Sequence, residues 1–220
     1  MFRLKEMPSV RAMDYIHLPA ASYKSAQPVQ TDLLGARAAI FRVTGGEHRL
    51  LILQRAETDS LPGCWELPGG GVEDDDESLK TALCREIKEE TGLTAAWIVQ
   101  EVGQGERWEK VKGGQTLHAM AVTFIVEAEE VEVWERGIGK EAKEADATRS
   151  GPTNDKGTSF DGISVKLSDA EHQDYMWVTE AQVRALQAGD RKLSMTRKMD
   201  KTIIKAFELQ QQIAMAKQTI

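Results

Sequence analysis

The sequence GVEDDDESLKTALCREIKEETGL, residues 71–93, carries the strongest structural signal in this chain of 220 residues. Its apolar residues recur every four positions, which is typical of a helix with one buried face: Leu79, Leu83 and Ile87. Ser78 precedes this pattern as an N-cap, and Gly92 follows it as a residue that ends a helix. The pattern therefore predicts a helix that packs one face on a sheet.

The same predicted helix carries three carboxylates side by side. Glu86 lies three residues before Glu89 and four before Glu90, so the three side chains share one surface. Like charges at these spacings cost a helix about 0.2–0.5 kcal/mol per pair. Bound Mg²⁺ or Mn²⁺ would offset this cost, because such ions prefer carboxylate oxygens, and the cluster holds no His or Cys that would favour zinc. A solvated acidic face is the alternative that the cluster alone leaves open.

Three glycines, Gly69, Gly70 and Gly71, come just before the acidic stretch. Because glycine lets backbone amides and carbonyls approach a ligand closely, we expect a loop that a phosphate or a metal ion can contact. Residues 71–93 hold eight acids and three bases, so they carry −5 of the net charge of −7. Most of the excess negative charge therefore lies next to the predicted glycine loop.

Short apolar runs bounded by turn residues predict strands on both sides of this helix: 35–43, 49–55, 97–102, 117–127, 163–167 and 175–178. A short helix is expected over 180–186, and a long one from about residue 195, with Met199, Ile203, Phe207 and Ile213 roughly on one face. Residues 1–34 are expected to be an N-terminal extension, because prolines interrupt any long helix there. The polar residues 128–161 are expected to be a flexible insertion.

The composition excludes several classes of protein. No run approaches 18 apolar residues, so a membrane span is not expected, and the first residues lack the apolar segment of a secretory signal. Two cysteines cannot form a disulfide framework, and they suit a reducing compartment such as the cytoplasm; an organelle transit peptide is left open. The negative net charge argues against general attraction to nucleic acid or anionic membranes.

Residues 71–93 also resemble a known family signature, the Nudix box G-x5-E-x7-R-E-U-x-E-E-x-G-U, where U is a bulky aliphatic residue. Every fixed position is matched: Gly71, Glu77, Arg85, Glu86, Ile87, Glu89, Glu90, Gly92 and Leu93. The preceding GCWELPGG, residues 63–70, is similar to the usual lead-in of the family. The resemblance implies an α/β/α sandwich with a mixed sheet over residues 35–188, followed by a C-terminal helix within residues 189–220.

The resemblance implies a metal-dependent hydrolase that cleaves a pyrophosphate bond in a nucleoside diphosphate linked to another moiety. The ligands of Mg²⁺ or Mn²⁺ would be Glu86, Glu89 and Glu90, with help from the carbonyl of Gly70. Two bound ions or more would let an acidic site accept a substrate that is itself negatively charged.

The remaining site residues are carried over in the same way. Arg85 is expected to pair with Glu77 and to orient the glutamates. Glu86 is one candidate for the base that activates the attacking water, and Glu171 is a second candidate outside the box. Arg55 ends a predicted strand near the glycines, where it contacts substrate phosphate or forms a surface ion pair.

The substrate is not fixed by the sequence. The markers of the ADP-ribose and diadenosine polyphosphate subclasses are absent after the box, so a small nucleotide derivative is expected without further detail. A non-catalytic Nudix-fold module that binds nucleotides is the alternative, and the intact glutamate set argues against it. A nucleic-acid substrate is not expected, and the apolar stripe of the last helix is expected to pack on the domain or in a homodimer interface.

Overall fold

The computed structural model describes residues 13–73, 75–129, 165–168 and 170–218. Within them, eight strands form one sheet, with bounds β1 Leu33–Thr44, β2 Glu47–Arg55, β3 Trp65–Glu66, β4 Gly69–Gly71, β5 Thr94–Glu101, β6 Glu106–Lys112, β7 Gln115–Glu129 and β8 His172–Val178. The path through the sheet is β3-β2-β1-β7-β5, while β4 pairs with β1, β6 with β7, and β8 with β2. Strands β1 and β7 are parallel and the other pairs are antiparallel, which confirms the predicted mixed sheet.

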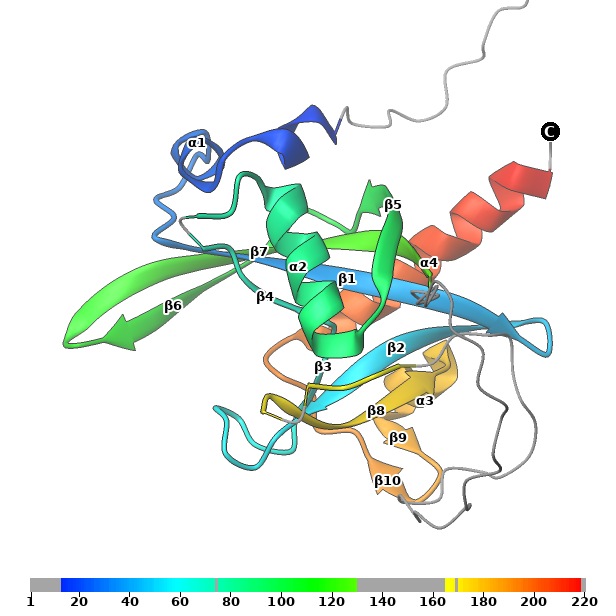
Figure 1. Ribbon diagram of the computed structural model, residues 1–220. Coiled ribbons are helices and arrows are strands. Elements are labelled where there is room, and N and C mark those ends of the chain that lie inside the picture. Colours follow the sequence, from blue (N-terminus) through cyan, green and yellow to red (C-terminus); the bar gives the residue numbers. More distant parts are fainter. Residues whose placement is uncertain (1–12, 74, 130–164, 169, 219–220) are drawn as a thin grey trace, which may run out of the picture.

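Helices cover both faces of this sheet (Figure 1). Their bounds are η1 Met13–His17 (a 3₁₀ helix), α1 Ala20–Ser25, α2 Leu79–Thr91, α3 Glu180–Ala185 and α4 Met199–Gln218. Helix α2 lies on one face, and α3 and α4 pack on the other, beside a small β9–β10 pair (Gln187–Ala188 and Arg191–Lys192). Among the described residues, no helix is both long enough and apolar enough to cross a membrane.

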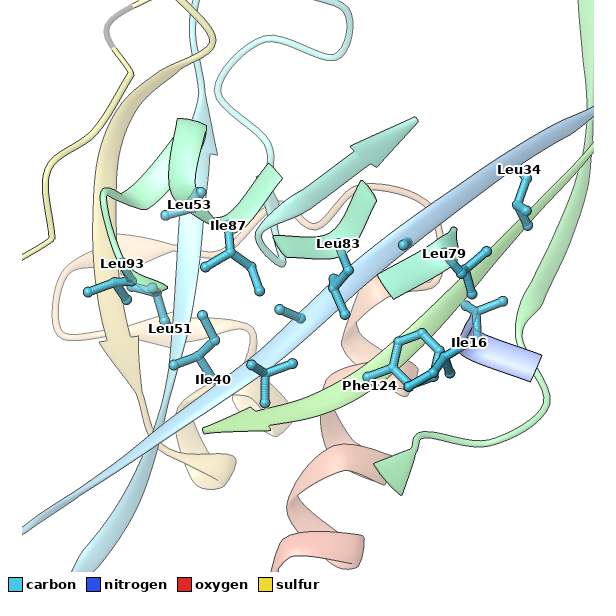
Figure 2. Close-up of a cluster of buried hydrophobic side chains, with 14 of the residues drawn as sticks. Ile16, Leu34, Ile40, Leu51, Leu53, Leu79, Leu83, Ile87, Leu93 and Phe124 are labelled. Atoms are coloured by element: carbon cyan, nitrogen blue, oxygen red, sulfur yellow. The ribbon is translucent and has the colours of Figure 1, made fainter. Parts of the chain in front are cut away.

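Two apolar cores fill the spaces between these layers. Side chains of a strand alternate between faces, so Leu51 and Leu53 of β2 point toward α2, whereas Leu50 and Ile52 point toward α4. Figure 2 shows the predicted stripe of α2 turned toward this sheet face: Leu79, Leu83 and Ile87. All three are fully buried, which confirms that this stripe anchors the helix.

The predicted ends of α2 are also confirmed. Ser78 caps the helix by accepting a hydrogen bond from the Thr81 N–H at 3.2 Å. Gly92 ends it in the left-handed region, with φ of 70°, and donates its N–H to the Lys88 carbonyl at 3.0 Å. Local capping chemistry therefore fixes where the acidic helix begins and ends.

The glycine segment is a strand rather than the predicted loop. Gly69, Gly70 and Gly71 form β4 and pair with Gly35–Arg37 of β1. A Cβ on Gly69 would lie 2.2 Å from the Ala36 carbonyl oxygen, so the two backbones can pair this closely only because the residue is glycine. The segment is consequently held rigidly beside α2.

Three further regions differ from the sequence-based expectation. Strand β6 was not predicted, because its residues are mostly charged and exposed at a sheet edge. Residues 165–167 of the predicted strand 163–167 lie in no strand, since the Lys166 N–H bonds to the Thr91 carbonyl at the end of α2. Of the predicted insertion 128–161, residues 128–129 end β7 and the others lie outside the described residues.

Both ends of the described chain pack on the domain. In the predicted N-terminal extension, η1 and α1 bury Ile16, Ala20 and Tyr23 in the core on the α2 side. Prolines therefore shorten these helices without preventing their packing. Helix α4 begins at Met199, four residues later than predicted, and its apolar face is confirmed because Met199, Ile203 and Phe207 are buried.

Candidate functional site

Helix α2 holds two of the three box carboxylates, those of Glu86 and Glu90, against the glycine strand β4, while Glu89 is exposed. The Gly69 N–H donates to Glu90 Oε2 at 2.6 Å. A Cβ on Gly70 would lie only 2.6–2.7 Å from the carboxylate atoms of Glu86. A side chain at residue 70 would therefore displace the Glu86 carboxylate, and the backbone of Gly70 and this carboxylate are direct neighbours.

The carboxylates are crowded and partly removed from water. Glu86 is 9% exposed and Glu90 is 4% exposed. Burial raises the pKa of Glu86, and the negative charges of Glu89 and Glu171 act in the same direction. Burial raises the pKa of Glu90 well above its usual value, with further contributions from Glu86, Glu66 and Glu171. This site concentrates negative charge that the protein itself only partly offsets.

Arg85 is the main internal cation of the cluster, and its partner differs from the predicted one. Its guanidinium donates to Asp76 at 2.9 and 3.2 Å, while Glu77 is exposed and not among its partners. Arg85 also donates to Glu86 at 3.0 Å and to Glu89 at 3.1 Å. The hydrogen bond from Arg85 lowers the pKa of Asp76, and the pKa of Arg85 is raised by the same contact.

The loop before α2 explains why Arg85 pairs with Asp76 and not with Glu77. The Glu73 N–H donates to Asp76 Oδ2 at 2.8 Å, which turns this carboxylate inward, where its side chain is 5% exposed. Ser78 then caps the helix, and Glu77 between them lines a separate hollow with His17. The predicted Arg85–Glu77 pair is therefore wrong, and Asp76 takes the place that the resemblance gave to Glu77.

Two site residues were missed by the sequence analysis, Glu66 and His172. Strand β2 lies between β3 and β8, and it brings Glu66 and His172 together beside Glu90. His172 Nε2 lies 3.5 Å from Glu66 Oε1 and 3.8 Å from Glu90 Oε1. The four histidines show no ligand spacing in the sequence, so only strand pairing reveals this neighbour; Glu66 does lie in the lead-in GCWELPGG.

The structure also brings Glu171 and Arg55 to the site. One ligand atom each from Glu171, His172 and Glu90 lie within 4.8 Å of one another. Arg55 pairs with Glu66 and Asp59 and also lines the adjoining cavity. Arg55 thus forms the ion pair that was one of the two expectations for it, and its contact with substrate phosphate stays a prediction.

A cavity of about 740 Å³ opens beside the carboxylates and β4. Its lining includes five basic residues, Lys24, Arg37, Arg55, Lys110 and Arg197, and three acidic ones, Asp32, Glu66 and Glu73, so basic side chains are in excess. Arg37 and Arg197 lie 5.7 and 4.1 Å from the ring centre of Trp108, and Arg37 also pairs with Glu106 at 2.9 Å. A cationic hollow next to an acidic cluster suits a ligand that carries several phosphates.

The donor set fits a hard divalent cation. It consists of carboxylate oxygens, with a glycine backbone in contact with one of them, and the crowded carboxylates repel one another. Positive charge from outside the chain would relieve this repulsion.

Curated proteins with known names match short stretches of this chain. Nudix hydrolase 25 of Arabidopsis thaliana is 51% identical over 43 residues, which cover 20% of this chain and 24% of that protein. The RNA pyrophosphohydrolase of Rhizobium meliloti (strain 1021) is 37% identical over 54 residues, which cover 24% of this chain and 31% of that protein. The chain thus spans only about a quarter to a third of the length of these curated relatives.

Solved structures share the fold. The NUDIX domain of Shewanella oneidensis NrtR, complexed with ADP ribose, is 18% identical and matches with a TM-score of 0.50, covering 86% of this chain and 97% of that one. The M. smegmatis Nudix hydrolase RenU is 20% identical with a TM-score of 0.50, covering 81% and 86%. The NUDIX domain model matches residues 33–149, and the chain therefore belongs to the Nudix family.

Proposed function

We propose that this chain is a divalent-metal-dependent pyrophosphohydrolase that cleaves a nucleoside diphosphate linked to another moiety. One observation carries the proposal: Glu86 and Glu90 contact the glycine strand, and this strand lines a cavity in which basic side chains outnumber acidic ones. Arg85 joins the exposed Glu89 to Glu86. A site that only needed to bind an anion would gain nothing from buried carboxylates, because they repel it.

The metal ligands would be Glu86, Glu89 and Glu90, with the carbonyl of Gly70 beside them. Bound Mg²⁺ or Mn²⁺ supplies positive charge to the phosphates and lowers the pKa of a bound water. Arg85 orients this set, because it bonds to Glu86 and Glu89 while Asp76 fixes its own position.

The chain offers two candidate bases for the attacking water. When ionised, the Glu86 carboxylate can accept a proton from the attacking water. Its Oε1 already accepts a hydrogen bond from Arg85, so Oε2 is the oxygen that would take this proton. Glu171 reaches the same cluster from the turn before β8. In either case, the proton of the attacking water would be accepted by a carboxylate of this cluster.

The cavity side chains would bind the rest of the substrate. Arg197 has no carboxylate partner in the ion pairs found within the described residues, and neither has Lys110. Their positive charges are therefore available for phosphate oxygens of a small nucleotide derivative. The phosphates would then lie between these basic side chains and the carboxylates that would hold the metal.

A panel of substrates tests the proposal. Release of phosphate or nucleotide is measured from deoxynucleoside triphosphates, ADP-ribose, dinucleotides, nucleotide sugars and capped RNA, each with Mg²⁺ and with Mn²⁺. We expect cleavage of at least one small nucleotide derivative, and loss of about 10²-fold or more in Glu89→Gln.

Glu208→Gln is the matched control for that variant. Glu208 is also a half-exposed glutamate on a helix that pairs with an arginine, but it lies on α4 away from the site. The proposal is refuted if no substrate of the panel is cleaved with either metal, or if Glu89→Gln is as active as Glu208→Gln.

A further inference from the structure

His172 is buried at the edge of the carboxylate cluster, where the proposed reaction gives it no role. It is the first residue of β8 and is 2% exposed. Its Nδ1 has no hydrogen-bond partner among the described residues. A histidine that served only to fill the core would have both ring nitrogens satisfied, as buried polar groups usually are. It is the other nitrogen, Nε2, that faces the carboxylates, at 3.8 Å from Glu90 Oε1, and this nitrogen is the one within reach of an ion at the cluster.

The surrounding atoms have the arrangement of a cation site. Single ligand atoms of Glu90, Glu171 and His172 all lie within 4.8 Å of one another, and His172 Nε2 is 3.8 Å from Glu90 Oε1. Two ligand atoms at about 2.1 Å from one octahedral ion lie about 3 Å apart. Small side-chain rotations would therefore bring these three groups onto one ion.

The arginines near this cluster are paired with other carboxylates. Arg55 pairs with Glu66, which is itself a neighbour of His172, so its positive charge is already engaged. Arg85 is bonded to Asp76, Glu86 and Glu89, and it has no bond to Glu90. Within the described part of the chain, neither Glu90 nor Glu171 forms an ion pair with a lysine or an arginine.

We propose that Glu90, Glu171 and His172 form a nitrogen-containing cation site which adjoins the box carboxylates and favours Mn²⁺, or another divalent ion that binds imidazole, over Mg²⁺. Imidazole suits transition metals, whereas Mg²⁺ prefers oxygen ligands only. The inference rests on the proposed function in that Glu90 is shared between the two ligand sets. It assigns Glu171 to cation binding, a role that the proposed function did not give to this residue.

Spectroscopy of bound Mn²⁺ tests the site without relying on activity. Electron spin-echo envelope modulation of the Mn²⁺-loaded protein is expected to show coupling to a directly bound ¹⁴N nucleus. His172→Gln is expected to abolish this coupling, because glutamine offers an oxygen ligand of similar reach and no imidazole. His118→Gln on β7 is the matched control, and it is expected to keep the coupling.

Calorimetric titration provides the second readout. His172→Gln is expected to lower the affinity for Mn²⁺ about tenfold or more while changing that for Mg²⁺ little, since even outer ligands of a metal matter at this level. Glu171 is exposed, so Glu171→Gln tests the same site without disturbing the core, and we expect it to weaken Mn²⁺ binding as well.

The outcomes separate the two proposals. Absence of ¹⁴N coupling in the unaltered protein, or its persistence in His172→Gln, overturns the nitrogen-containing site. His172 would then be a buried neighbour of the carboxylates that binds no ion, and the proposed pyrophosphate cleavage would still stand. A clear ¹⁴N coupling in a protein that cleaves nothing in the substrate panel would overturn the proposed function and leave this site standing.

Discussion

The partner of Arg85 gives the sharpest test of the structure, because two adjacent acids compete for that role. Asp76→Asn removes the charge that Arg85 contacts at 2.9 and 3.2 Å, in a side chain that is 5% exposed. Hydrogen bonds to charged groups contribute about 1.5–3 kcal/mol. Arg85 is partly exposed and keeps its bonds to Glu86 and Glu89. We therefore expect Asp76→Asn to lower the free energy of unfolding by about 2 kcal/mol, near the lower end of that range.

The pH dependence of that loss follows from the direction of the shift. The hydrogen bond from Arg85 lowers the pKa of Asp76 below its usual value of 3.8. A carboxyl group with a lowered pKa stabilises the fold above its unfolded value, and this stabilisation is lost as the pH falls through the folded value. Asp76→Asn should therefore cost most at neutral pH, and the difference from the unaltered protein should shrink below about pH 4.

Urea unfolding at neutral and acidic pH measures both effects. The neighbouring substitution Glu77→Gln is the matched control, because Glu77 is exposed and is not among the partners of Arg85. We expect it to change the free energy of unfolding by less than about 0.5 kcal/mol. A larger loss in Glu77→Gln than in Asp76→Asn would refute the pairing described here and restore the one that the sequence predicts.

Three further substitutions test other parts of the structure. Gly70→Ala places a Cβ 2.6–2.7 Å from the Glu86 carboxylate, so we expect at least tenfold weaker Mn²⁺ binding by calorimetry, and unchanged binding would contradict the close approach. Arg197→Gln is expected to raise KM for nucleotide substrates several-fold with little change in kcat, whereas Lys198→Gln, which does not line the cavity, should change neither; equal effects of the two would remove Arg197 from the substrate site. Leu83→Ala empties a fully buried position under α2 and should lower the free energy of unfolding by about 2–5 kcal/mol in urea titrations, and a loss below 1 kcal/mol would contradict its burial.

The parts of the fold that could be predicted from the sequence are those set by local rules. Capping by Ser78 and Gly92 and the four-residue apolar spacing define α2 without reference to any other segment. The strand of glycines was not predictable in this way. Glycines 69–71 look like a loop until β1 lies beside them, and the strand forms because the missing side chains allow the two backbones to approach.

The same difference between local and long-range rules decides which residues of the candidate site could be predicted. Residues of α2 could be placed from spacing alone, because a helix fixes its own geometry. Glu66 and His172 are more than a hundred residues apart, and only the pairing of β3 and β8 with β2 brings them together. Asp76 was missed for a different reason: the family pattern singles out Glu77, whereas a turn closed by the Glu73 N–H points Asp76 inward instead.

The charge balance of the cluster leads to one more prediction. Five carboxylates act on one another here: Glu66, Glu86, Glu89, Glu90 and Glu171. The two arginines at the cluster, Arg55 and Arg85, are already shared with Asp59 and Asp76. The ionised cluster thus lacks sufficient positive charge, and a buried charge without a full partner destabilises a fold.

Removing one of these charges should therefore stabilise the metal-free protein. Glu90→Gln keeps an oxygen that accepts the Gly69 N–H and removes a carboxylate that is 4% exposed. We expect a higher melting temperature than that of the unaltered protein in EDTA, and the opposite order when Mn²⁺ is saturating, because a metal that binds only the folded state stabilises it. Glu208→Gln should leave both melting temperatures unchanged. If Glu90→Gln destabilises the protein in EDTA as well, Glu90 is held by internal contacts alone, and the cluster needs no cation to explain it.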